Sequence, residues 1–183
     1  MTLVLLLVLA AALAWAIVAF NRLVRLRNQV RAGWSDIDVQ LMRRHDLVPM
    51  LVEAVRAYAG HEKGVYEKVA ELRSAALSTK SPAQLAGIES ELEQNLGRLM
   101  VIKEAYPELK ASENFLRLQH DLVDVEDHLQ YARRFYNGAV RELNDGVQKF
   151  PDLLIANAFA FKQAEFFEVP DGAGVAPKLG LNP

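Results

Sequence analysis

An uninterrupted apolar run near the N-terminus constrains this chain more than any other feature of its sequence. Residues 3–20 are all Leu, Val, Ala, Ile, Trp or Phe, and no charged side chain precedes Asn21. As a helix rising about 1.5 Å per residue, this run is about 27 Å long, close to the hydrocarbon thickness of a bilayer. We therefore predict a transmembrane anchor over residues 1–21, held in lipid by side chains that include Leu3, Leu7, Trp15 and Phe20.

Basic residues on one side of the run predict its orientation. Arg22, Arg25 and Arg27 follow it directly, whereas only the α-amino group precedes it. Because Lys and Arg close to a span stay in the cytoplasm, we expect the N-terminus outside and the rest of the chain inside. A cleaved signal peptide is the alternative, since alanines in the run offer a cleavage site, but the usual basic start is missing.

The composition of the chain limits its partners and its chemistry. The 183 residues carry a formal net charge of −2, so no overall field favours nucleic acid. Cysteine is absent, which excludes disulfide scaffolds and thiolate chemistry. We expect the lipid bilayer and other proteins as partners, and no cofactor.

From Leu23 onward, apolar side chains recur every three or four residues, which predicts an all-α fold. The clearest seam begins after Ser112, a candidate N-cap, and stops before Phe150-Pro151. Its nine positions are Phe115, Leu118, Leu122, Val125, Leu129, Ala132, Tyr136, Ala139 and Leu143.

Three further helical stretches are predicted, at residues 23–59, 61–77 and 82–106. The first continues the membrane helix without a Gly/Pro cluster between them, and Pro49 should kink or break it. Ser81 to Gln84 is a capping box with proline at the first helical position, while Pro107 should end that helix and residues 108–112 should form a polar turn. Short turns between amphipathic helices favour an antiparallel up-and-down four-helix bundle over residues 22–168.

The C-terminal part of the chain has two distinct compositions. Residues 153–167 are rich in aromatic side chains, which either cover the end of the bundle or dock on a partner or the membrane surface. Residues 169–183, with three Gly and three Pro, are predicted to be a disordered tail. The aromatic candidates for a partner surface are Phe159, Phe161, Phe166 and Phe167.

Polar side chains are densest on the predicted helix around Arg44. Arg44 and His45 lie between Leu41 and Val48 on the apolar stripe, so we expect at least one of them to be partly buried. One interpretation is an ion-pair network that fixes helix register, and the other is a site for a partner or a lipid phosphate beside Pro49. The candidate residues of this cluster are Asp36, Asp38, Arg43, Arg44, His45, Asp46, Arg133 and Arg134.

No pattern in the sequence indicates catalysis. His61-Glu62 has no second histidine four residues on, and no Glu-x-x-His pair is present for a di-iron site. His120, Asp124 and His128 share a helix face, but they lie off the apolar seam, where a solvated charged face is the simpler interpretation. Nucleophile elbows and phosphate-binding glycine loops are missing. We therefore predict a protein that is not an enzyme and holds no metal.

Several blocks of sequence together resemble the LemA family. They are Trp34–Leu41, Arg43–Pro49, Leu51-Val52, Glu104–Ala111, Glu113–Phe115, Ala132–Asn137, Phe150-Pro151 and Phe166–Glu168. The family pattern more often has alanine at Gly33 and a polar residue at Met42, which leaves the resemblance intact. The resemblance implies a bacterial inner-membrane protein with one N-terminal span and a cytoplasmic four-helix bundle, and it implies no established enzymatic activity.

Three functions are compatible with these features. The one we favour is a membrane-anchored scaffold or adaptor that binds other proteins and associates with itself. A membrane-shaping protein that oligomerises on the cytoplasmic leaflet is the second, and a metal-dependent sensor or enzyme is the third.

Overall fold

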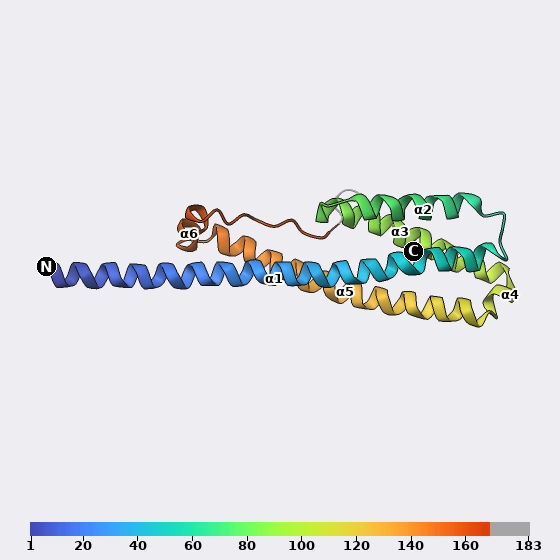
Figure 1. Ribbon diagram of the computed structural model, residues 1–183, viewed down its shortest axis with the longest axis horizontal. Helices are drawn as coiled ribbons and strands as arrows, with labels where there is room; N and C mark the ends of the chain where they lie inside the picture. Colours follow the sequence, from blue (N-terminus) through green and yellow to red (C-terminus); the bar gives the residue numbers. More distant parts are fainter. Residues whose placement is uncertain (169–183) are drawn as a thin grey trace, which may run out of the picture. The chain divides into compact units, whose positions relative to one another are not determined.

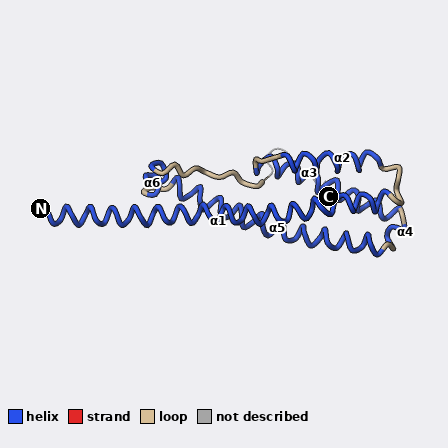
Figure 2. Tube along the Cα trace, viewed as in Figure 1, coloured by secondary structure: helices blue, strands red, loops and turns tan. Residues whose placement is uncertain are grey.

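The computed structural model describes residues 1–168, and the predicted disordered tail lies outside the described residues. Within that part of the chain every regular element is a helix, which confirms the predicted all-α class (Figure 2). The helices are α1 (Thr2–Arg56), α2 (Lys63–Ser78), α3 (Pro82–Ile102), the 3₁₀ turn η1 (Lys103–Ala105), α4 (Pro107–Lys110), α5 (Glu113–Gln148) and α6 (Asp152–Ala158) (Figure 1).

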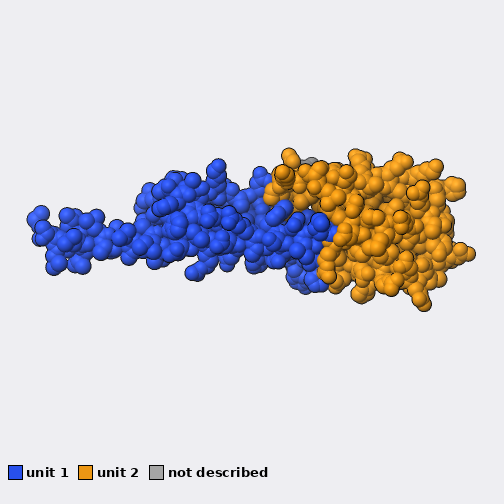
Figure 3. Space-filling model, in the orientation of Figure 1, with its two compact units in different colours: residues 1–42, 126–166 blue, residues 43–125, 167–183 orange. Residues whose placement is uncertain are grey.

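The chain divides into two compact units, which Figure 3 colours separately. Unit 1 contains residues 1–42 and 126–166. Unit 2 contains residues 43–125 together with Phe167 and Glu168. The N-terminal part of α1 and the C-terminal part of α5 therefore belong to unit 1, and their other halves belong to unit 2.

Helix α1 joins the apolar run to the amphipathic stretch without interruption, as predicted. Among the described residues, this is the one helix long and apolar enough to cross a membrane, and almost all of its apolar window is uncovered. Downstream of Phe20 the expected stripe is buried, with Leu23, Ile37 and Val55 fully covered. The break that Pro49 could cause does not occur, because α1 continues to Arg56 with Pro49 on its exposed side.

The core of unit 2 contains side chains from all four long helices. Val48, Leu51 and Val55 of α1 belong to this core. They form one cluster with Val69 and Leu72 of α2, Leu92, Leu96 and Leu99 of α3, and Phe115 and Leu118 of α5. The hydroxyl of Tyr66 donates to the carbonyl of Ala59 at 2.7 Å, which holds α2 against the end of α1.

In unit 1, α1 packs closely against α5. The rings of Trp34 and Tyr136 are 5.4 Å apart, and the backbones approach each other closely at Gly33. A Cβ at Gly33 would lie 3.0 Å from the Cα of Tyr136, so the missing side chain permits this contact. On α5 the predicted seam is confirmed, since every position except the half-buried Leu122 is buried.

The helix boundaries follow the predicted caps, with one correction. Oγ of Ser81 accepts a hydrogen bond from the backbone N–H of Gln84, and Oγ of Ser112 accepts one from Phe115. The predicted polar turn at 108–112 is wrong in part, because Pro107 begins the short helix α4. A helix needs no N–H at its first position, so proline is suited to start one there. Leu109 of α4 is fully buried in the unit 2 core.

Candidate functional site

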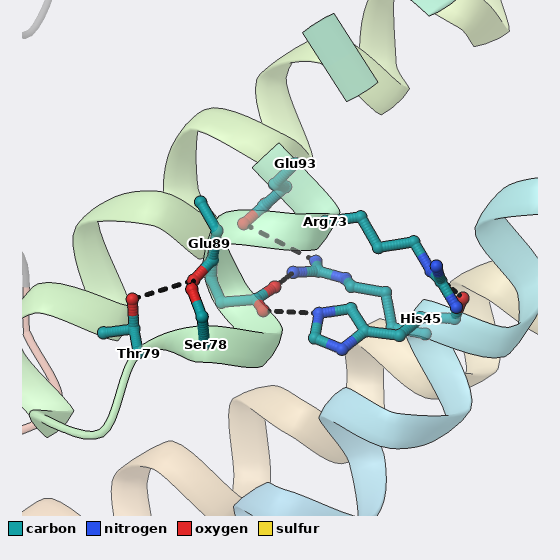
Figure 4. A network of polar contacts seen from close by, with 8 residues as sticks. His45, Arg73, Ser78, Thr79, Glu89 and Glu93 are labelled. Atoms are coloured by element: carbon teal, nitrogen blue, oxygen red, sulfur yellow. Dashed lines mark hydrogen bonds and ion pairs between the residues drawn. The ribbon is translucent and has the colours of Figure 1, made fainter. Parts of the chain in front are cut away.

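Three polar side chains meet in the interior of unit 2 (Figure 4). Nη1 of Arg44 lies 3.0 Å from one carboxylate oxygen of Glu89, and Nε2 of His45 lies 2.7 Å from the other. The side chains of Arg44 and Glu89 are only 1% and 0% exposed. Because an ionised carboxylate only accepts hydrogen bonds, Nε2 of His45 must be the protonated nitrogen. The arrangement joins α1 to α3 at one fixed register.

The charges in this network decide the protonation state of Glu89. Burial by itself would raise the pKa of Glu89, because it penalises the charged form. The hydrogen bond and charge of His45 and the charge of Arg44 outweigh burial and hold the pKa below its usual range. Glu89 is therefore ionised at neutral pH and neutralises Arg44 inside the protein.

A second arginine completes the network from α2. Nε of Arg73 donates to the backbone carbonyl of His45 at 2.7 Å. In a regular helix that carbonyl would accept the N–H of residue 49, which is a proline here. Arg73 thus replaces the hydrogen bond that Pro49 cannot make, and α1 continues across the proline.

The other members of the predicted polar cluster lie outside this network. Asp36, Asp38, Arg43 and Asp46 are exposed on α1. In unit 1, Nη1 of Arg133 lies 3.8 Å from Glu126, and Arg134 stacks over Tyr131 with 4.7 Å between its guanidinium carbon and the ring centroid. The carboxylate that receives Arg44 comes instead from α3.

Glu89 was not among the predicted site residues. On α3 the apolar Ile88 is only partly buried, whereas the neighbouring Glu89 is fully buried. A signal was nevertheless present, because Glu89 lies four residues after Leu85 and three before Leu92. A charged residue at such a position is expected to have an oppositely charged partner in the core.

Each unit also has an open groove on its surface. In unit 1 a groove of about 330 Å³ is lined by Asp36, Val39, Gln40, His128, Tyr131, Ala132 and Phe135. In unit 2 a groove of about 360 Å³ is lined by Arg43, Asp46, Leu47, Asp121, Asp124 and Val125. Among residues 1–168, no three His, Asp or Glu side chains are grouped so as to hold a metal ion.

The residues of the predicted anchor are arranged along the first part of α1. Leu3 and Leu7 are exposed, Trp15 and Phe20 are partly covered, and the predicted arginines that follow are exposed. Arg22 forms an ion pair with Asp152 of α6, with 3.1 Å between Nη1 and Oδ2.

The predicted aromatic surface is divided between contacts within the protein and exposed positions. The ring of Phe20 lies 4.8 Å from that of Phe159 and 5.7 Å from that of Phe161. Phe166 is partly buried, and Phe167 is buried.

Hydrogen bonds hold the segment after α6 against α5. The hydroxyl of Tyr136 donates to the carbonyl of Glu165 at 2.8 Å, and the Asn144 amide exchanges two hydrogen bonds with the backbone of Ala164. Burial and the nearby charge of Glu165 raise the pKa of Tyr136 to about 12. The Tyr136 hydroxyl is therefore a stable donor at neutral pH.

The sequence of this chain is similar to one protein family and to several known proteins. Residues 33–180 match the model of the LemA family. The chain is 24% identical to magnetosome protein MamQ of Magnetospirillum gryphiswaldense, over 90% of this chain and 70% of the relative. It is 23% identical to magnetosome protein MamQ 2 of Paramagnetospirillum magneticum, over 86% of this chain and 68% of the relative. Identity to protein LemA of Metamycoplasma hominis is 23%, over 82% and 69% of the two chains.

Proposed function

The chain belongs to the LemA family, and on this premise we propose that it is a membrane-anchored helical scaffold on the cytoplasmic face of the bacterial inner membrane. Its proposed role is to bind other proteins, including further copies of itself, at that membrane, without catalysing a reaction. The helical part is proposed to be an antiparallel up-and-down four-helix bundle. The shared core of α1, α2, α3 and α5 in unit 2 supports this arrangement.

The observation that carries the proposal is the continuity of α1. Its apolar run and its amphipathic part form one helix from Thr2 to Arg56, without a loop between them. A hydrogen-bonded helix is a semi-rigid spacer, whereas a glycine-rich linker would let the helical part move freely. A protein bound to unit 1 would therefore be held at a fixed height above the lipid.

Orientation follows from the charges beside the apolar run. Arg22, Arg25 and Arg27 are exposed at its C-terminal end, where the anionic headgroups of the proposed membrane would lie. Keeping these residues in the cytoplasm places the helical part inside the cell.

The surface we propose for self-association is the groove of unit 1. Val39, Tyr131 and Phe135 around it are all more than half exposed, and Arg134 orders the Tyr131 ring by stacking on it. Exposed aromatic side chains are typical of the central part of protein interfaces. Two anchored copies would carry this groove at the same height, which favours a symmetric contact between identical surfaces.

A photocrosslinking amino acid tests this surface in intact membranes. Replacing Tyr131 should give a crosslinked species of twice the mass of the chain. Arg141 is the matched control, because it is exposed on a different face of α5. Crosslinking at Tyr131 no stronger than at Arg141 would contradict self-association, and a crosslinked species of another mass would identify a different protein in the groove.

A further inference from the structure

Helix α6 packs against α1 at the level where the apolar run ends. Besides the contacts of Phe159 and Phe161 with Phe20, Asp152 pairs with Arg22, and Arg27 stacks over Phe161 with its guanidinium carbon 5.1 Å from the ring centroid. All of these contacts lie within unit 1. They place residues 150–161 beside residues 20–27 of α1 (Figure 1).

The depth of this segment in a membrane follows from the position of the apolar run. Headgroups extend roughly 5–8 Å beyond the hydrocarbon on each side of a bilayer, which is about three to five residues of helix. If Phe20 ends the hydrocarbon span, Arg22 lies among the headgroups. Ala19 is only 3% exposed although it belongs to the apolar run, so protein already covers α1 at the hydrocarbon boundary. Residues 150–161 are therefore at the depth of the membrane interface.

Three large apolar side chains of this segment are not covered by any other part of the described chain, residues 1–168. Phe150 is 79% exposed, Leu154 is 55% exposed and Phe159 is 58% exposed. Ile155 and Ala156 are buried, so α6 has one apolar side against the protein, and its outward side carries the exposed Leu154. In water such an outward side is unfavourable, whereas at a membrane interface aromatic and aliphatic side chains are favourable.

Positive charge lies at the same level. A pocket of about 470 Å³ is lined by Arg22, Arg25, Leu26, Gln29, Glu142, Asp145 and Lys149. Of its three basic side chains, Arg22 pairs with Asp152 and Lys149 pairs with Asp145 of α5 at 2.8 Å. All three basic side chains are exposed, so lipid phosphates can reach them. Basic side chains next to exposed apolar ones are the composition of interfacial membrane anchors.

We propose that residues 150–161 form a second membrane contact, in which Phe150, Leu154 and Phe159 insert at the boundary between headgroups and acyl chains. This surface would bind the lipids of the bilayer leaflet from which α1 emerges after Phe20. This inference rests on the proposed membrane anchor. Two contacts, one through α1 and one through α6, fix the rotation of unit 1 about the α1 axis, which a single span leaves free.

Single cysteine reporters test the contact in the full chain, which has no cysteine of its own. Leu154→Cys and Phe150→Cys report on the proposed contact, and Leu9→Cys reports on the span. Gln130→Cys on α5 is the aqueous control, because Gln130 is exposed and does not line the groove proposed for self-association. Each variant is labelled with an environment-sensitive fluorophore and placed in vesicles of phosphatidylethanolamine and phosphatidylglycerol. Aqueous iodide and a spin-labelled lipid are the two quenchers.

We expect labels at 150 and 154 to be quenched by the lipid probe and to be several-fold less accessible to iodide than the label at 130. Iodide access at 154 equal to that at 130, with the label at 9 in lipid, would overturn this inference and leave the anchor standing. A label at 9 that is open to iodide would overturn the anchor itself. Protection at 154 without quenching by the lipid probe would mean that protein covers α6, which also contradicts the inference. Far-UV circular dichroism confirms that each variant is folded.

Discussion

Arg73 of α2 donates a 2.7 Å hydrogen bond to the backbone carbonyl of His45, the acceptor that Pro49 leaves without its helical donor. The bond satisfies a carbonyl inside a packed region and connects α2 to α1 at the position where α1 would otherwise be weakest. His45 uses its side chain at the same time to bind Glu89 of α3. His45 lies on α1, its imidazole binds α3 and its backbone carbonyl accepts from α2. One residue therefore joins three helices.

Replacing Arg73 with methionine should lower the free energy of unfolding by about 1–3 kcal/mol, because the His45 carbonyl loses the donor that takes the place of the Pro49 N–H. Pro49→Ala restores the N–H of residue 49 and should remove most of this cost. Urea denaturation of the two single variants and the double variant in mild detergent measures the coupling. Independent, additive effects of the two substitutions would show that Arg73 does not replace the missing bond.

Breaking the buried ion pair should be far more costly than removing it completely. Arg44→Met leaves the Glu89 carboxylate charged in the interior, and we expect a loss of about 3–5 kcal/mol. Glu89→Leu alone should be similarly destabilising, while the double variant should recover most of the stability because both charges are gone. Thermal unfolding followed by circular dichroism provides the comparison. An unchanged melting curve for Arg44→Met would mean that the guanidinium is accessible and available for binding.

The free energy of unfolding should decrease at acidic pH, because Glu89 becomes protonated. Its pKa is lower in the folded protein than the value of about 4.3 in an unfolded chain, so the unfolded state takes up the proton first as the pH falls. The stabilisation is complete above about pH 4.3 and is lost as the pH decreases through the folded pKa. Denaturation between neutral pH and pH 3 should show a steeper decline for the native chain than for Glu89→Gln. If the free energy of unfolding decreased equally with pH in the two proteins, the acid sensitivity would come from residues other than Glu89.

Two glycines of unit 1 should respond in opposite directions to added side chains. At Gly33 even a Cβ would come within 3.0 Å of the Tyr136 backbone, so Gly33→Leu should force α1 and α5 apart and lower the melting temperature. At Gly138 an added Cβ would meet no described residue within 4 Å apart from the adjoining backbone of α5 itself, so Gly138→Ala should stabilise α5 by up to about 1 kcal/mol through helix propensity. If both variants melt alike, the close approach at Gly33 does not exist.

The helices could be predicted from the sequence because the residues that determine each helix lie close together in the chain. The seam from Phe115 to Leu143 and the cap at Ser81 depend on residues within a few turns of one another. Pro107 was misjudged because a proline is compatible with the end of one helix and with the start of another. The choice depended on Leu109, whose burial in the unit 2 core favours a further helical turn.

The polar network was only half predictable for a physical reason. The position of Arg44 and His45 on an apolar stripe was visible in one helix, whereas their partner depends on how α1 and α3 pair in space. Glu89 lies among other acidic residues on α3, and its spacing to Leu85 and Leu92 gains meaning once a buried cation is known. Arg73 was equally hidden, because its partner is a backbone atom freed by Pro49.

Membrane topology is the most direct test of the account, because the scaffold and the interfacial contact both depend on it. Thr2→Cys and Asp127→Cys are probed in intact cells with a maleimide that cannot cross the inner membrane. The account predicts that Thr2→Cys is labelled from outside and that Asp127→Cys is labelled only after the membrane is opened. Labelling of Asp127→Cys in intact cells, or recovery of the chain without its first twenty residues, would contradict it.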